Sequence, residues 1–173
     1  MHYNRMDAST RPATLSPCTC FCVRKLARRV SRLYDQELAE CGLRVTQYSL
    51  LATLAAGEAT SLSALADRME MDRTTLTRNL RPLLAQDLVA LEGDARDARR
   101  RAARITDTGR ARLREARAAW KRAQRATEAL LGTQGVDTLH AVVDDALARL
   151  RPADAARART HATHDRQDEE STA

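Results

Sequence analysis

The sequence of 173 residues predicts a mainly α-helical fold that contains one short β-hairpin. Aromatic residues make up only 3% of the chain, whereas leucine, alanine and arginine, which favour helices, are abundant. Between Ser61 and Thr106 the residue pattern runs in the order helix, turn, basic helix, arginine-rich hairpin. This order predicts a winged helix-turn-helix with a short β-hairpin wing. Further amphipathic helices are expected on both sides of it.

Two helices are predicted ahead of this segment. Apolar residues three or four positions apart predict a helix over about 21–39, and Gly42 can end it in a left-handed conformation. A second pattern predicts a helix over about 45–56. Residues 1–17 show no periodicity, so we expect a flexible tail there.

The predicted helix-turn-helix follows. Its first helix opens at Ser61, and Asp72 can begin the second helix by accepting backbone N–H bonds. The second helix, about 73–86, carries leucines on one face. Short hydroxyl side chains and arginines occupy the other face, an arrangement that suits entry into a DNA groove with clamping of phosphates. The predicted DNA contacts on this helix are Arg73, Thr74, Thr75, Thr77, Arg78 and Arg81.

A strand-like run over 87–91 leads into the hairpin, where Gly93 and Asp94 can form a turn. An isolated run of charges is more often a solvated face. Directly after a helix-turn-helix, however, arginines at a hairpin tip are expected to contact phosphates or enter a narrow minor groove. The predicted contacts here are Arg96, Arg99, Arg100 and Arg101.

Two helices are predicted after the hairpin. Thr106 can cap a long helix that ends near Leu131, but its apolar positions are too sparse for the helix to be stable without a partner. A last helix is predicted over 136–150. Residues 151–173 carry charged and small residues without an apolar stripe and are expected to be a disordered tail.

The flanking helices point to a second copy of the chain. Their apolar faces exceed what one small module can cover, and two-fold dimers are the commonest closed assembly. We therefore expect a homodimer built from 18–41 and 107–150, with 43–106 as the winged helix-turn-helix. Such a dimer would read a palindromic operator.

Charge and composition bound the function. A net charge of +6 and a pI near 9.7 predict an anionic partner, and double-stranded DNA fits best. No apolar run approaches the ~18 residues of a spanning helix, and the N-terminus lacks a signal-peptide core, so we expect a cytoplasmic protein without a membrane partner. Because no catalytic constellation is visible, we predict no enzyme and no cofactor. The alternative is a helical protein–protein adaptor, which would not need the arginine-rich hairpin.

Residues 18–150 resemble the MarR family of dimeric winged-helix repressors. The resemblance rests on the wing residues Asp94, Asp97 and Arg99, on Ile105-Thr106 followed by Gly109, and on the segments 45–51, 63–66 and 72–77. It implies that Arg99 enters the minor groove, that Asp97 and Asp94 support the wing, and that a small inducer or a thiol-reactive signal releases the DNA.

The chain departs from the family pattern at two places. Asp87 stands where the family usually has glycine, although aspartate tolerates a left-handed turn better than most residues. Ala102 and Ala103 stand where larger apolar residues are usual.

Three cysteines, Cys18, Cys20 and Cys22, lie where the tail meets the first helix, and Cys41 lies alone. They are either small apolar residues of the dimer core or a sensor of oxidants or of a soft metal or metalloid. In a regular helix Cys18 and Cys22 share a face and Cys20 points away, whereas a frayed start would let all three converge on one ion.

The effector site has two candidate locations. Cys20-Phe21 and Tyr34 resemble the reactive cysteine and a contacting tyrosine of the family's organic-peroxide sensors, although Arg24 and Val45 replace two further tyrosines. The candidate sensing residues are therefore Cys18, Cys20, Cys22 and Tyr34. The alternative is a pocket for an aromatic or amphipathic small molecule, lined by Tyr34, Tyr48 and Trp120.

Overall fold

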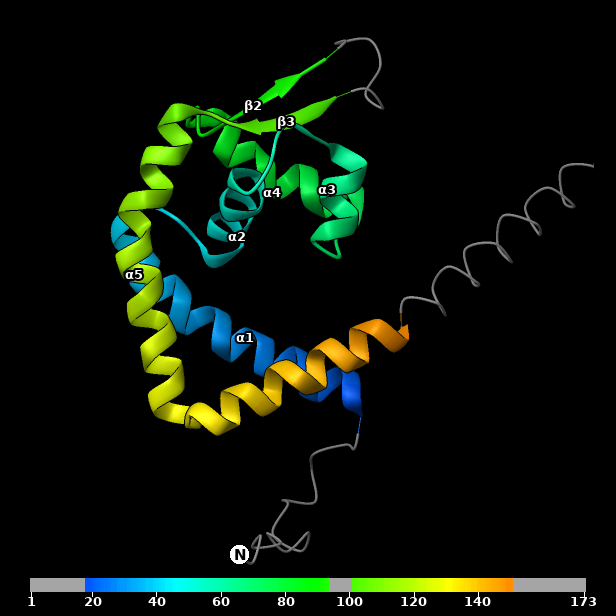
Figure 1. Ribbon diagram of the computed structural model, residues 1–173, viewed down its shortest axis with the longest axis vertical. Helices are drawn as coiled ribbons and strands as arrows, with labels where there is room; N and C mark the ends of the chain where they lie inside the picture. The colour runs from blue at the N-terminus through cyan, green and yellow to red at the C-terminus, as the bar shows by residue number, and fades with distance from the viewer. Residues whose placement is uncertain (1–17, 94–100, 151–173) are drawn as a thin grey trace, which may run out of the picture. The chain divides into compact units, whose positions relative to one another are not determined.

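The computed structural model describes residues 18–93 and 101–150, and helices dominate it (Figure 1). The elements in chain order are α1 (Thr19–Leu38), a 3-10 helix η2 (Ala39–Cys41), α2 (Val45–Ala55), β1 (Thr60–Ser61), α3 (Leu62–Arg68), α4 (Arg73–Ala85), β2 (Val89–Glu92), β3 (Ala102–Ile105) and α5 (Asp107–Leu131). A further helix spans 133–150. The predicted fold class is confirmed, because the helices flank a helix-turn-helix with the two strands of a wing.

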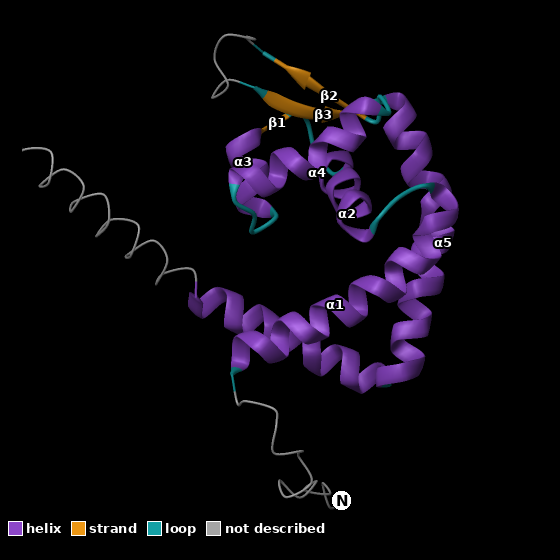
Figure 2. Cartoon of the chain, turned by 180° about the vertical axis from the view of Figure 1, so that it is seen from behind, coloured by secondary structure: helices purple, strands orange, loops and turns teal. Residues whose placement is uncertain are grey.

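The strands form one antiparallel sheet in the order β1-β3-β2 (Figure 2). Val89 pairs with Ile105, and Glu92 pairs with Ala102, which fixes the register of the predicted hairpin. The short strand β1 adds to the other edge, where Thr60 pairs with Ala103. The sequence did not predict β1, because two residues carry no readable periodicity.

Most of the buried core side chains are leucines. α2 contributes Leu50, Leu51 and Leu54, and the sheet closes the core with Val89 and Ile105. The helix-turn-helix adds Leu65, Leu76, Leu80 and Leu83, each at most 2% exposed. The periodic leucines therefore bury one face of α4 and leave its other face to the solvent.

The base of the hairpin is joined to α5 by a compact set of contacts. The Thr106 hydroxyl donates to the Asp87 carbonyl at 2.6 Å and accepts the Gly109 N–H at 2.9 Å, so it caps α5 as predicted. Asp87 adopts the left-handed conformation expected of it, with φ 53°. Gly109 lies so close to Leu88 that an added Cβ would stand 2.0 Å from the Leu88 carbonyl oxygen.

α5 is also attached to α1 and α2. The Arg122 guanidinium bonds to Glu37 at 2.7 Å and also pairs with Glu40, while the Tyr34 hydroxyl donates to Gln124. The Trp120 ring stacks on Tyr48 with 5.9 Å between the ring centroids. These contacts hold the first part of α5 against the N-terminal elements.

The described residues fall into two compact units, which divide between Gln124 and Arg125. In the first unit, α1 buries only Leu38, and the apolar side chains near its start are exposed: Phe21, Val23 and Leu26. In the second unit, the helix over 133–150 exposes Val142, Val143, Leu147 and Leu150.

Candidate nucleic-acid interface

The second helix of the helix-turn-helix begins with a strong cap. The Asp72 carboxylate accepts the Thr75 N–H at 2.7 Å and the Thr75 hydroxyl at 2.6 Å. These bonds, with the Thr75 hydroxyl first, lower the pKa of Asp72 below its ordinary value. The cap keeps the carboxylate charged and occupied, so it orients the first turn of α4 as the sequence predicted.

The exposed face of α4 is cationic and concave. Its side chains line a surface pocket of about 480 Å³ that contains Arg73, Thr74, Thr77, Arg78 and Arg81. α4 itself contains no acidic residue. Five of the six residues predicted from the sequence to contact DNA on this helix thus lie together on one surface, which we call the α4 face.

Thr75, the sixth predicted residue, lies apart from this surface. Its side chain is half-buried, and its hydroxyl proton is directed to Asp72. Thr77 lines the α4 face, but its hydroxyl donates to the backbone carbonyl of Arg73 at 2.8 Å. The sequence could not distinguish these two threonines from Thr74, because all three fit a helix start equally well.

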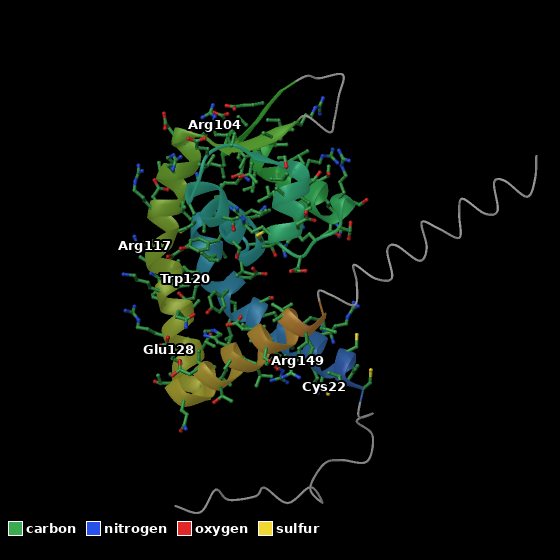
Figure 3. All side chains as sticks on the ribbon, turned by 45° about the vertical axis from the view of Figure 1, so that its right-hand side comes forward. Cys22, Arg104, Arg117, Trp120, Glu128 and Arg149 are labelled. Carbon is green, nitrogen blue, oxygen red and sulfur yellow. The ribbon has the colours of Figure 1, made fainter. Side chains whose placement is uncertain are left out.

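The hairpin strands carry one cation that the sequence analysis did not single out. Arg104 on β3 is exposed and pairs with Glu92 on β2 (Figure 3). This hydrogen bond raises the pKa of Arg104. The two positions lie near each other across the paired strands, so an alignment of β2 with β3 would have revealed the pair.

Most of the predicted wing lies outside the described residues, namely Asp94, Arg96, Asp97, Arg99 and Arg100. Arg101 is described: its carbonyl accepts the Leu62 N–H at 3.2 Å and so ties the start of β3 to the start of α3. This hydrogen bond therefore holds the base of the hairpin, next to the predicted tip, against the helix-turn-helix.

The sequence and fold match known proteins. The family model described as MarR family matches residues 42–100. The transcriptional regulator MosR of M. tuberculosis is 32% identical, with 77% of this chain and 97% of MosR covered and a TM-score of 0.65. The chain belongs to the MarR family. None of the curated proteins matches it.

Two further structures similar to this MarR-family chain were solved with DNA. MosR in complex with DNA is 35% identical, with coverage of 78% of this chain and 98% of MosR and a TM-score of 0.65. The repressor CouR, bound to a 23-mer DNA duplex, is 22% identical and shares the fold, with coverage of 75% and 92% and a TM-score of 0.66. BpsR of Bordetella bronchiseptica also shares the fold at 21% identity, 78% and 96% coverage and a TM-score of 0.66.

The candidate sensing cysteines are exposed. Cys18, Cys20 and Cys22 all reach the solvent at the start of α1, and Figure 3 labels Cys22 there. The Cys22 N–H bonds to the Cys18 carbonyl at 3.2 Å, so the helical geometry that puts these two on one side is present. Among the described residues no group of three ligand side chains is arranged to hold a metal ion, so the three thiols do not converge.

The aromatic residues named for the two candidate effector sites lie further along the chain. Tyr34 lies fourteen positions after Cys20 on the unbroken helix α1, about 21 Å away at 1.5 Å per residue. Within one chain the intact helix α1 therefore keeps these two side chains apart. Tyr48 and Trp120 stack on each other and pack against the core, and burial raises the pKa of Tyr48.

Cys41 has a different environment from the other thiols. It is half-buried at the end of η2, and its carbonyl accepts a bond from Arg112 at 3.0 Å. Burial, and then the neighbouring Glu40, raise the pKa of this thiol. Both effects disfavour the reactive thiolate form of Cys41. In its burial Cys41 also differs from the three exposed cysteines at the start of α1.

No helix among residues 18–93 and 101–150 is both long and apolar enough to cross a membrane.

Proposed function

We propose that this MarR-family chain is a homodimeric repressor that binds a palindromic DNA operator and is released by an inducer. The observation that carries the proposal is the α4 face, where three arginines and two threonines line one concave surface without an acidic residue on the helix. Cations and hydroxyl groups at the start of a recognition helix suit the major groove and its phosphates. A dimer that covers a promoter would block transcription, which is also the role named for CouR.

The direct test is a mobility-shift titration with the duplex upstream of the protein's own gene and with random duplex. We expect tight binding to the first and weaker, salt-sensitive binding to the second. Absence of binding to both, together with capture of a protein partner, would support the adaptor alternative instead. Transcription in vitro that rises with added protein would contradict repression.

The wing is proposed to contribute through its arginines. Arg99→Ala should weaken binding to all duplexes and reduce the slope of log affinity against log salt by about one unit for each wing lost. Arg28→Ala, on α1, serves as a control with the same charge change. An unchanged slope in Arg99→Ala would remove the wing from the proposal.

Dimerisation is proposed because both ends of the described chain expose apolar helix faces. Phe21 and Val23 near the start of α1 are 43% and 59% exposed, and Leu150 at the end of the last helix is 59% exposed. Large apolar side chains gathered on helix faces mark association surfaces. A second copy of the chain would cover both faces and place two recognition helices for the two halves of a palindrome.

We further propose that the cysteine cluster receives the inducing signal as an oxidant. One exposed thiol would attack an organic hydroperoxide, forming a sulfenic acid and releasing the corresponding alcohol, and a second thiol would then displace water from the sulfenic acid to form a disulfide. Because the cluster begins α1, the new bond would tilt that helix against the dimer partner and change the spacing of the recognition helices.

The test replaces Cys18, Cys20 and Cys22 together by serine, with Cys41→Ser as the matched control. Release of DNA is measured with peroxide, with trivalent arsenic and with a salicylate-like acid. We expect peroxide to release the wild type and Cys41→Ser but not the triple variant. A triple variant that answers peroxide as the wild type does would reject the thiol site, and release by the acid alone would favour the small-molecule pocket.

A further inference from the structure

The α4 face has a central ridge. Thr74, Arg78 and Arg81 are spaced by four and three residues, which places them one above another on the side opposite the buried leucines Leu76, Leu80 and Leu83. All three are exposed. Arg73 and Thr77 lie at the margin of this ridge. The part of the helix that would approach a groove most closely is therefore the ridge itself.

Two of the three threonine hydroxyl groups of α4 donate hydrogen bonds within the described residues, and the third does not. Thr75 and Thr77 direct their protons to Asp72 and to the Arg73 carbonyl, and Asn79 donates to the Thr75 carbonyl at 2.9 Å. Within the described part of the chain, no hydrogen bond uses the Thr74 hydroxyl. Thr74 is thus the hydroxyl of the helix start that can both donate to and accept from an external group.

The Arg78 guanidinium is similarly available. It forms no ion pair within 4.0 Å in residues 18–93 and 101–150. Asp72, the residue that caps α4, lies close enough to interact with Arg78 through its charge, but both oxygens of its carboxylate already accept hydrogen bonds from Thr75. A guanidinium with a planar fork of free donors matches the O6 and N7 acceptors of guanine in the major groove.

Arg78 and Arg81 differ in their position along α4, and therefore in the part of the DNA that they are expected to contact. Recognition helices contact base edges with their N-terminal residues, whereas later residues meet the backbone as the groove curves away. Arg78 lies in the second turn of α4, one turn after Thr74, and Arg81 lies in the third. We therefore expect Arg78 to contact a base edge and Arg81 to contact the DNA backbone.

We propose that Arg78 reads a guanine in each operator half-site through paired hydrogen bonds to O6 and N7, with Thr74 contacting the neighbouring base and Arg81 contacting a phosphate. This inference rests on the proposed DNA binding and adds the base that the α4 face selects. The operator accordingly carries a G·C pair at one symmetric position in each half, and Arg78 specifies it.

The experiment selects bound duplexes from a randomised library with the full-length protein and then substitutes each base pair of the recovered operator. For the wild type, loss of the guanine should weaken binding roughly 10- to 100-fold. In Arg78→Ala that preference should disappear at this position alone. Arg78→Lys should keep only part of it, because lysine lacks the planar fork. Arg81→Ala should keep every base preference and lose about one unit of salt slope per protomer.

The outcomes distinguish a failure of guanine recognition by Arg78 from a failure of DNA binding. If Arg78→Ala keeps every base preference, or if Arg81→Ala loses the guanine preference, the assignment of Arg78 is overturned while DNA binding stands. If the wild type binds no duplex, the proposed function and this inference fail together. Because Arg78 and Arg81 are exposed, thermal unfolding of both variants should match the wild type, which excludes loss of fold as the cause.

Discussion

At the scale of single residues, the joint between the wing and α5 depends on Thr106, Asp87 and Gly109. The Thr106 hydroxyl uses both its donor and its acceptor capacity, on the Asp87 carbonyl and the Gly109 N–H. The close approach of Leu88 to Gly109 leaves no room for a side chain. The family resemblance indicated these positions, but the sequence did not predict the contact between Gly109 and Leu88, because it joins two segments that are not adjacent in the sequence.

Gly109→Ala is predicted to destabilise the chain by roughly 3 kcal/mol. Alanine would favour the helix by only about 0.5–1 kcal/mol, and the backbone clash outweighs that gain. Gly135→Ala is the matched control, since its new Cβ would meet Leu131 at an ordinary 3.6 Å. Urea unfolding should show a lower midpoint for the first variant and an equal or higher midpoint for the second. Equal midpoints for the two would contradict the packing described.

Asp87 provides a second prediction at this scale. Its φ of 53° costs a residue with a side chain about 1–2 kcal/mol, less for aspartate than for alanine. Asp87→Gly should therefore leave the free energy of unfolding unchanged or raise it, and Asp87→Ala should lower it by about 1 kcal/mol. Chemical denaturation of the three proteins in parallel measures the order. An alanine variant as stable as the glycine variant would disprove the left-handed turn.

At the scale of elements, helices were predictable and short pairings were not. The leucines of α4 and the caps Asp72 and Thr106 lie in sequence patterns that can be read locally, and the structure confirms them. β1 is only two residues long and is defined by its pairing with β3. Likewise, which threonine of α4 is free depends on hydrogen bonds that no periodicity reveals. The α4 face was therefore predictable from the sequence, whereas the roles of its individual threonines depend on hydrogen bonds in the folded chain.

The cap of α4 predicts a pH dependence. Because hydrogen bonds from Thr75 lower the folded-state pKa of Asp72 below its ordinary value, the cap contributes stability that is fully present above the pKa of the unfolded chain. The contribution is lost as the pH falls through the lowered folded-state pKa. Asp72→Asn keeps a cap without a titrating group. Unfolding measured from neutral pH downward should show the wild-type advantage shrinking in acid, and a constant difference would contradict the cap.

At the scale of the whole molecule, the proposed repressor consists of two copies of the chain. Leu147 is 41% exposed in a single chain, so a charge placed there should leave the protomer folded and oppose its association. Leu147→Asp is predicted to be monomeric by light scattering at micromolar concentration and to lose binding to a palindrome. Ala148→Asp adds the same charge about 100° around the helix and should remain dimeric. A dimeric Leu147→Asp would move the interface elsewhere.

The central claim is that the α4 face binds duplex DNA. The most direct measurement is the equilibrium affinity of the full-length protein for its upstream duplex and for random duplex, titrated over a range of salt concentrations. The account predicts that log affinity falls linearly with log salt for both duplexes, and that the specific duplex binds at least about 10³-fold more tightly. A folded protein whose affinity for both duplexes is negligible even at low salt would contradict the account.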